Sequence, residues 1–213
     1  MCPNDSFENK LLYSVLLLNR KEKKMLISKY LTSDTDMEKE VAAFEEKFRM
    51  ALPEPYRKFL IRYNGGETPN TSFKINHEDS DVRAFYGIGD VEYSFDKILE
   101  FDVYLKRGLL PIARDFFGNY VAIGISADES GKIFFLDHEK NMKAKLLTDT
   151  FEEFVKKCKS KKIAEERTRS IEERERSMIE AGNEMRITDG LRKIWAEEIR
   201  KYGGMKQERV VLK

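Results

Sequence analysis

The chain has 213 residues, enough for one compact domain with extensions. Apolar residues make up 41% of the sequence, which argues against wholesale disorder. Charged residues reach 36%, so part of the chain must be unusually solvated. The net charge is only +1, so the whole molecule has no electrostatic reason to bind nucleic acid directly.

Charge is distributed unevenly along the chain. Residues 1–35 hold 6 basic and 4 acidic side chains, residues 36–158 hold 18 and 23, and residues 159–213 hold 15 and 11. An acidic middle followed by a basic tail indicates regions with different roles. We therefore expect an N-terminal extension over 1–34, an α+β domain over 35–158 and a charged helical extension over 159–213.

The cysteine content and the apolar runs bear on location. Two cysteines at opposite ends of the ordered chain, Cys2 and Cys158, do not make a disulfide framework, so we expect a reducing, cytoplasmic environment. No apolar run reaches membrane-spanning length. We interpret the apolar stretch 11–18 as a buried strand or helix of the N-terminal extension. Alternatively, the native start is Met25 or Met37 and this stretch is not native structure.

Two helices are expected near the start of the central domain. The first begins near Asp36, where Thr35 and Glu38 have the spacing of a capping box. The second begins at Pro53, whose fixed φ suits a first helical turn, and ends at the glycines of 64–66. Its apolar residues recur at helical spacing and predict one buried face, which comprises Tyr56, Phe59, Leu60 and Tyr63.

Short strands dominate the rest of the domain. We expect strands at 72–75, 82–88 and 91–93, then a helix that Ser94 caps and Gly108 ends. Alternating apolar residues flank turns at 116–119 and 128–131, which predicts a three-stranded antiparallel meander. A closing helix begins at Thr150, which has capping-box spacing with Glu153. The fold class is therefore α+β, an antiparallel sheet packed with helices.

The C-terminal region has a different texture. Residues 159–180 are rich in both charges and poor in apolar side chains, which predicts a long, solvated helix. A second helix follows with a better apolar face, formed by Leu191, Ile194, Trp195, Ile199 and Tyr202. The last residues form a strand or a frayed tail. Because this region offers the core little apolar surface, we expect truncation after Lys162 to leave a cooperatively folded domain.

Four sequence blocks, in this order, carry a family resemblance. They are LPEPYRKFLIRYNGG at 52–66, PIARDFFGNYVAIGIS at 111–126, GKIFFLDHE at 131–139 and TFEEFVKKC at 150–158. Together they resemble the SUKH superfamily of Smi/Knr-like proteins over roughly 36–158. The resemblance implies an antiparallel sheet with helices, no cofactor and function through binding. Many bacterial members are immunity proteins against polymorphic toxins, often nucleases, and fungal relatives resemble regulators of cell-wall assembly.

The sequence offers no catalytic constellation, so we expect neither an enzyme nor a metal site. Asp137, His138 and Glu139 form a cluster, but neighbouring strand residues point to opposite faces and do not converge on one ion. Cys158 lies on an apolar helix face and is expected to be buried and inert. Gly118 and Asn119 suit a tight turn.

Acidity between residues 76 and 104 is the feature we associate with function. This segment holds eight carboxylates and only two Lys or Arg residues, Arg83 and Lys97. Tyrosines, which often anchor interfaces, lie between the acidic residues. Such a face favours a basic partner. The expected partner-binding residues are Glu78, Asp79, Asp81, Tyr86, Asp90, Glu92, Tyr93 and Asp115, the last as an exposed loop carboxylate.

Two functional hypotheses remain open from the sequence. In the first, the chain is an immunity protein that neutralises a basic toxin, such as a nuclease, through its acidic face. In the second, it is an intracellular scaffold or regulator that docks through its charged C-terminal helices. Neither hypothesis involves a membrane, and the sequence does not set the oligomeric state.

Overall fold

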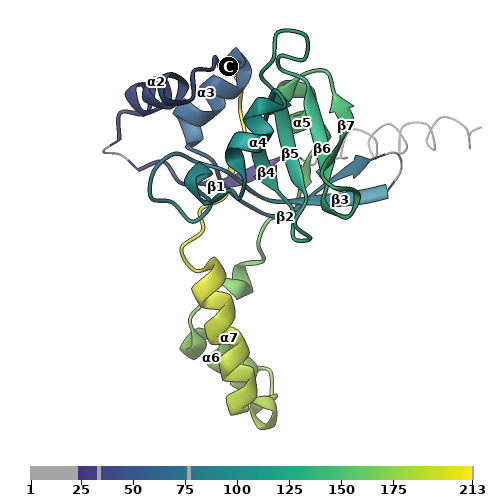
Figure 1. The fold of residues 1–213 in the computed structure, drawn as a ribbon. Coiled ribbons are helices and arrows are strands. Elements are labelled where there is room, and N and C mark those ends of the chain that lie inside the picture. Colours follow the sequence, from purple (N-terminus) through teal and green to yellow (C-terminus); the bar gives the residue numbers. More distant parts are fainter. Residues whose placement is uncertain (1–23, 33–34, 76–77, 213) are drawn as a thin grey trace, which may run out of the picture.

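One antiparallel sheet is the framework of the molecule. A computed structural model describes residues 24–32, 35–75 and 78–212. Over these residues the strands lie in the order β7-β6-β5-β4-β3-β2-β1-β9, and β8 pairs with β2 beside this path (Figure 1). The strands are β1 Leu26–Lys29, β2 Gly66–Ile75, β3 Glu78–Phe85, β4 Leu109–Arg114, β5 Tyr120–Gly124, β6 Ile133–Asp137, β7 Lys143–Thr148, β8 Lys159–Ser160 and β9 Glu208–Arg209. The predicted α+β class is confirmed.

Helices pack on this sheet and also extend away from it. They are α2 Met37–Phe48, α3 Glu54–Tyr63, α4 Phe101–Lys106, α5 Phe151–Lys157, α6 Ile171–Glu180 and α7 Asp189–Tyr202. Short 3₁₀ turns occupy Phe95–Lys97, His138–Lys140, Glu165–Arg167 and Glu184–Arg186. None of the helices in the described ranges combines the length and the apolarity that a bilayer crossing requires. The predicted segment at 11–18 lies outside the described residues.

The buried face predicted for α3 is confirmed. Its four apolar residues are between 0% and 1% exposed. Phe59 lies at the centre, with its ring centroid 5.0 Å from that of Phe85 on β3 and 5.3 Å from that of Phe151 on α5. Burial of each such ring contributes about 1.5–3 kcal/mol, so this contact joins helix, sheet and closing helix into one core.

The turn after α3 fixes how the helix enters the sheet. Asn64 adopts the left-handed conformation with φ 51°, and its side-chain amide bonds both backbone groups of Ile88. Gly65 follows with φ 71°, and a Cβ there would lie 2.5 Å from the carbonyl oxygen of Tyr86. Asn64 and Gly65 therefore suit the positive φ angles of this turn, and Gly65 also leaves room for the nearby backbone of Tyr86.

The predicted meander is confirmed, and two neighbouring predictions are wrong. Strands β4, β5 and β6 pair antiparallel around the two turns. Residues 91–93 are not a strand, and the single helix expected after Ser94 is broken. It splits into a 3₁₀ turn and α4 because Glu100 takes a left-handed conformation with φ 54°. At α2 the capping residue is Asp36, which accepts from the N–H of Lys39.

The C-terminal region leaves the sheet and then returns to it. After β8, the chain forms a projecting pair of helices, α6 and α7, which with the preceding 3₁₀ turn we call the stalk (residues 165–202; Figure 1). The chain then pairs as β9 with β1, and Val210 is buried in the core at 7% exposure. The sheet therefore crosses the boundaries predicted at residues 34 and 158, because β1, β8 and β9 lie outside them.

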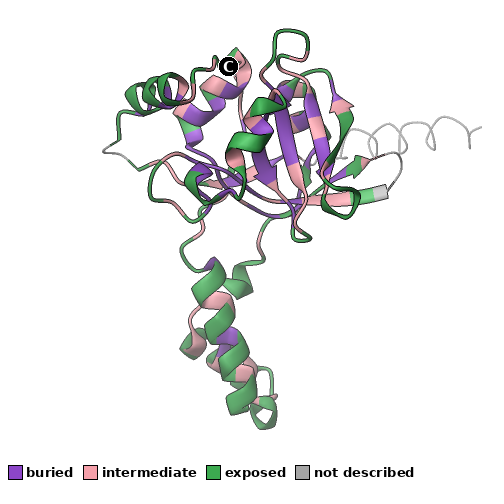
Figure 2. Cartoon of the chain, viewed as in Figure 1, coloured by how far each residue is buried: buried purple, intermediate pink, exposed green. Residues whose placement is uncertain are grey.

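The stalk is held together largely by polar contacts. The predicted long helix over 159–180 is wrong, since α6 begins only at Ile171, where Ser170 and Glu173 form a capping box. The buried guanidinium of Arg174 bonds Glu198 at 2.8 Å and lies over the ring of Trp195. Most other stalk residues are exposed (Figure 2). The stalk therefore has its own small hairpin core, separate from that of the sheet.

Candidate partner-binding groove

An open groove lies beside the turn between β4 and β5. It has a volume of about 710 Å³ and is bordered by the β2–β3 hairpin, by β6 and by β7. Its apolar surface comes from Ile75, Phe117 and Phe135. The polar residues that line it are Ser72, Asp79, Ser80, Asp81, Asp115, Asn119, Asp137, Lys140, Lys143 and Lys145, with Ala144 between the last two.

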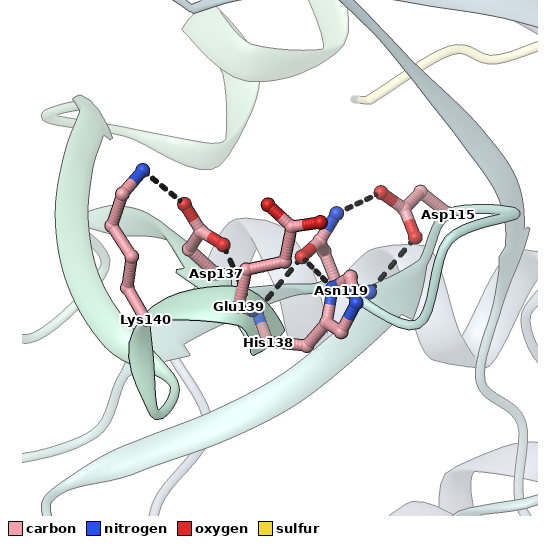
Figure 3. A network of polar contacts seen from close by, with 6 residues as sticks. All are labelled: Asp115, Asn119, Asp137, His138, Glu139 and Lys140. Atoms are coloured by element: carbon pink, nitrogen blue, oxygen red, sulfur yellow. Dashed lines mark hydrogen bonds and ion pairs between the residues drawn. The ribbon is translucent and has the colours of Figure 1, made fainter.

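Asp115 is the buried support of the turn at the groove. Only 2% of the residue is exposed. Its Oδ1 accepts hydrogen bonds from the backbone N–H groups of Phe117 and Asn119, both at 2.8 Å. Its Oδ2 accepts from the side-chain amide of Asn119, and Figure 3 shows the contacts between Asp115 and Asn119. A carboxylate that satisfies three donors fixes the path of the whole turn.

Asn119 extends this network to the next loop. Its Oδ1 accepts from the backbone N–H of His138 at 2.9 Å and from the ring Nδ1 of the same residue at 2.8 Å (Figure 3). The amide has one consistent orientation, because Nδ2 faces a carboxylate while Oδ1 faces donors. The ring proton of His138 therefore lies on Nδ1. The two loops that border the groove are joined through a single side chain.

Asp137 closes the network at the other end. Its carboxylate accepts from the ammonium of Lys140 at 2.7 Å and from the backbone N–H of Glu139 at 3.1 Å. The Lys140 hydrogen bond lowers the pKa of Asp137 below its usual value. This carboxylate is half-buried and already paired, so it shapes the loop of Lys140 and does not present a free charge.

The turn that Asp115 fixes carries two exposed rings. Phe116 is 50% exposed and Phe117 is 71% exposed. Large apolar side chains held in water at a fixed position are typical of interaction surfaces. From the sequence, residues 116–119 are expected only to form a turn. The missed signal was two consecutive phenylalanines within a tight turn, where both rings can hardly turn inward.

Asp81 links the hairpin β2–β3 to this turn. Its Oδ1 accepts from the backbone N–H of Phe116 at 3.2 Å. Partial burial raises the pKa of Asp81, and the nearby carboxylate of Asp115 raises it further, while the hydrogen bond and Arg83 act in the opposite direction. Asp81 therefore stays at the groove as a carboxylate whose ionised form is less favoured than that of a free aspartate.

The comparison with known families adds to this geometry. A family model described as the SMI1 / KNR4 family (SUKH-1) matches residues 37–157. This chain belongs to that family. The match spans α2 to α5, so the SUKH-1 domain contains every residue that lines the groove, and the stalk lies outside it. No curated protein matches the chain closely enough to be reported as a relative.

Within the SUKH-1 domain, the predicted acidic face is divided. Asp79 and Asp81 line the groove, whereas Glu92 lines a second hollow of about 590 Å³ between the sheet and α7. Asp90 is exposed on the loop that follows β3. The side chain of Glu78 lies outside the described positions. The predicted carboxylates thus do not form one surface.

Three of the predicted contact residues are buried, which corrects the expectation that they are accessible. Tyr86 is 3% exposed and Tyr93 is 8% exposed. The ring of Tyr93 is covered by the guanidinium groups of Arg83 and Arg114, at 5.3 Å and 5.9 Å. Asp115 was expected to offer an exposed carboxylate and instead satisfies backbone N–H groups. These residues therefore act mainly by supporting the SUKH-1 surface, although Asp115 also lines the groove.

The stalk contacts the groove turn of the SUKH-1 domain at Phe116. The ring of Phe116 lies 5.0 Å from the guanidinium of Arg83 and 5.9 Å from the ammonium of Lys201 on α7. Such cation–π contacts at exposed sites contribute about 0.5–1 kcal/mol each. The contact places the base of the stalk next to the loop that borders the groove.

The groove of the SUKH-1 domain presents charged and apolar side chains to solvent. No group of three or more His, Cys, Asp or Glu side chains converges on a metal-sized position in residues 24–32, 35–75 and 78–212. Cys158 is fully buried, as predicted, and burial raises the pKa of its thiol, so the reactive thiolate is disfavoured. Charged walls and exposed rings around an open groove are suited to holding a protein segment.

Proposed function

We propose that this chain is an immunity protein that binds a protein toxin in the groove and neutralises it. Membership of the SUKH-1 family supports this proposal, because the bacterial members that the sequence resembles commonly have this role. The proposal assigns no catalysis to the chain: the groove holds the toxin and blocks it. It places both proteins in the cytoplasm of the cell that makes the toxin.

The exposed, preorganised pair Phe116–Phe117 is the observation that carries the proposal. The Asp115 network holds the turn in place before any partner arrives. A loop that is already ordered loses little conformational freedom on binding, and aromatic side chains at the centre of an interface contribute much of its affinity. The turn therefore holds the two phenylalanine rings in a fixed position for a partner to bind.

Charge supports a basic toxin such as a nuclease. Asp79 and Asp81 on β3 lie next to the turn that carries Phe116 and Phe117. A nuclease has cationic side chains that bind phosphates, and these side chains would be attracted to the two carboxylates. Lys143 and Lys145 on β7 make the groove mixed in charge, so the partner surface must be mixed as well. The acidic side of the groove attracts the approaching toxin, and the rings of Phe116 and Phe117 stabilise the complex.

Co-expression with the product of the adjacent gene tests the proposal. Cells that express the neighbouring gene as the toxin should survive with the wild-type chain and die with the Phe117→Ala variant. Leu99→Ala is the matched control, because Leu99 is 80% exposed but lies on the loop before α4, outside the groove. Equal protection by the wild type and by Phe117→Ala would count against the groove as the binding site.

A scaffold or regulator is the second candidate, and the stalk is what favours it. Ile179, Met185 and Ile194 are 52%, 99% and 58% exposed, and they lie on the part of the molecule that projects from the sheet. In that case a partner from the same cell would co-purify through the stalk. A pull-down with a stalk-less variant distinguishes the two, since toxin capture through the groove would survive and scaffold capture would not.

A further inference from the structure

The two sides of the groove carry opposite charge. Asp79 and Asp81 stand on β3, and Lys143 and Lys145 stand on β7. Among the described residues, the ion pair of Asp79 is the long one with Lys74, at 3.8 Å between exposed groups. No ion pair joins Lys143 or Lys145 to another residue in the described part of the chain. Asp79, Lys143 and Lys145 therefore have charges available to an occupant, while Asp81 already uses Oδ1 to accept from the N–H of Phe116.

The surface between these sides is mainly apolar, and its polar groups already have hydrogen-bond partners within the protein. Phe135 and Ile75 contribute to it, and the Asp115–Asn119–His138 network uses its polar groups internally. Asp137 is paired with Lys140. An occupant therefore meets carboxylates on one side, ammonium groups on the other and mainly apolar contact between them.

This arrangement specifies the conformation of the occupant. In an extended segment successive side chains point to opposite sides, so every second residue faces the same wall. A helix turns its side chains through all directions and presents only one stripe to a groove. An extended segment therefore directs alternate side chains to the two sides of the groove along its whole length.

β7 is also an outer strand of the sheet, and its lysines restrict what can lie along it. Residues Lys143 to Leu146 are exposed, and the ladder to β6 is the one strand pairing that the described residues give β7. Lysines on an edge strand oppose pairing with a second copy of the same edge, because like charges would meet. They favour instead a segment that brings carboxylates.

We infer that the groove selects an extended segment of the partner in which basic and acidic residues alternate. The basic residues face Asp79 and Asp81, and the acidic residues face Lys143 and Lys145. This inference rests on the proposed function, since it names the part of the toxin that enters the groove. The recognised feature is the order of the charges and not their sum.

Two synthetic peptides of equal composition test the inference. One alternates lysine and glutamate, and the other carries the same residues in two blocks. Fluorescence anisotropy at low salt, where exposed charges are least screened, should show the alternating peptide binding roughly tenfold more tightly. Equal affinity of the two peptides would overturn the inference.

Charge-reversal variants of the whole chain provide the second arm. Lys143→Glu with Lys145→Glu, and separately Asp79→Lys with Asp81→Lys, should each weaken binding of the alternating peptide by about tenfold. The combined variant should regain binding, because its walls are still opposite and the peptide shifts by one residue. The β7 pair leaves Asp81 and its bond to Phe116 intact, so it reports on charge even where the β3 pair disturbs the turn.

The outcomes separate this inference from the proposed function. Failure of the combined variant to regain binding, with each variant shown to be folded by thermal melting, would mean that the two walls do not act as a pair. If the wild-type chain still protects cells from the toxin in that case, the immunity role stands and only the alternating segment is wrong. Loss of protection by Phe117→Ala is independent of both peptide measurements.

Discussion

The hydroxyl of Tyr63 accepts a hydrogen bond from the backbone N–H of Val211 at 2.8 Å. This bond joins α3, at the centre of the domain, to a residue near the far end of the chain. Val210 beside it is buried, and β9 just before it pairs with β1. The returning end of the C-terminal region therefore belongs to the core, although the stalk does not.

Truncation after Lys162 should therefore be costly, contrary to the expectation from sequence. Loss of the Val210 side chain, the β1–β9 pairing and the Tyr63 bond should lower the free energy of unfolding by about 3–5 kcal/mol. An internal deletion offers the control. The N–H of Ile163 bonds Gln207 at 2.8 Å, so the two ends of the stalk are adjacent and a short glycine–serine linker can replace residues 164–205. Urea denaturation of both variants should show near wild-type stability for the internal deletion alone.

Asp115→Ala should destabilise the domain and release the turn. It leaves the N–H groups of Phe117 and Asn119 without their acceptor, which should cost about 2–4 kcal/mol. Asp90→Ala, an exposed carboxylate of the same chain, should change stability by less than about 0.5 kcal/mol. Thermal melts measure both effects. If the two variants melt alike, the Asp115 network does not hold the turn.

Asp81 should give the domain a stability component that declines as pH rises. Its pKa is raised in the folded state, so folding favours the protonated form. Below the unfolded pKa of about 3.9, Asp81 is protonated in both states and does not lower the free energy of unfolding. As the pH rises from that value to the raised pKa of the folded state, ionisation of Asp81 lowers the free energy of unfolding progressively. The stability of Asp81→Asn relative to wild type should therefore increase as the pH is raised from 3 towards 7. Denaturant melts across that range provide the measurement, and a parallel pH dependence of both proteins would contradict it.

Association with the cognate toxin should depend on one acidic pair and not on the other. Reversal of Asp79 and Asp81 to lysine should slow association by about one to three decades, the range usual within one interface. Reversal of Asp90 and Glu92 should have little effect, because these residues lie outside the groove. Stopped-flow measurements at rising salt give the comparison.

The stalk provides a further control for that measurement. Reversal of Glu165, Glu166, Glu172 and Glu173 should leave association unchanged if the groove is the site. A strong effect of the stalk reversal, together with a weak effect at Asp79 and Asp81, would favour the scaffold hypothesis.

Local patterns predicted much of the domain because they are governed by local physics. The face of α3, the stop at Asn64 and the meander all follow from spacing, propensity and turn chemistry within a few residues. The β1–β9 pairing could not be predicted in this way. Two residues of β9 carry no periodicity, and their position depends on β1 at the other end of the chain.

The candidate site was harder to predict because exposure is a tertiary property. Asp115 is polar and lies in a turn, yet it is buried, since the turn needs an acceptor for its own N–H groups. Tyr93 is buried because two arginines fold over its ring. The sequence identified Asp79 and Asp81 as candidates from charge alone, but their lysine counterparts on β7 come from a segment about 60 residues away.

The pairing of Leu26 with Arg209 has a consequence for the order of folding. Contacts between residues so far apart in sequence form late, because closing a long loop costs entropy before any contact compensates for it. The hairpin of α6 and α7 lies inside that loop and depends on nearby residues, so it can form on its own and bring the two ends of the insertion together. During synthesis the strands that border the groove would be available to pair before β9 has been made. Pairing of β9 with β1 then completes the sheet, so the domain reaches its full stability only after residues 208 and 209 have been synthesised.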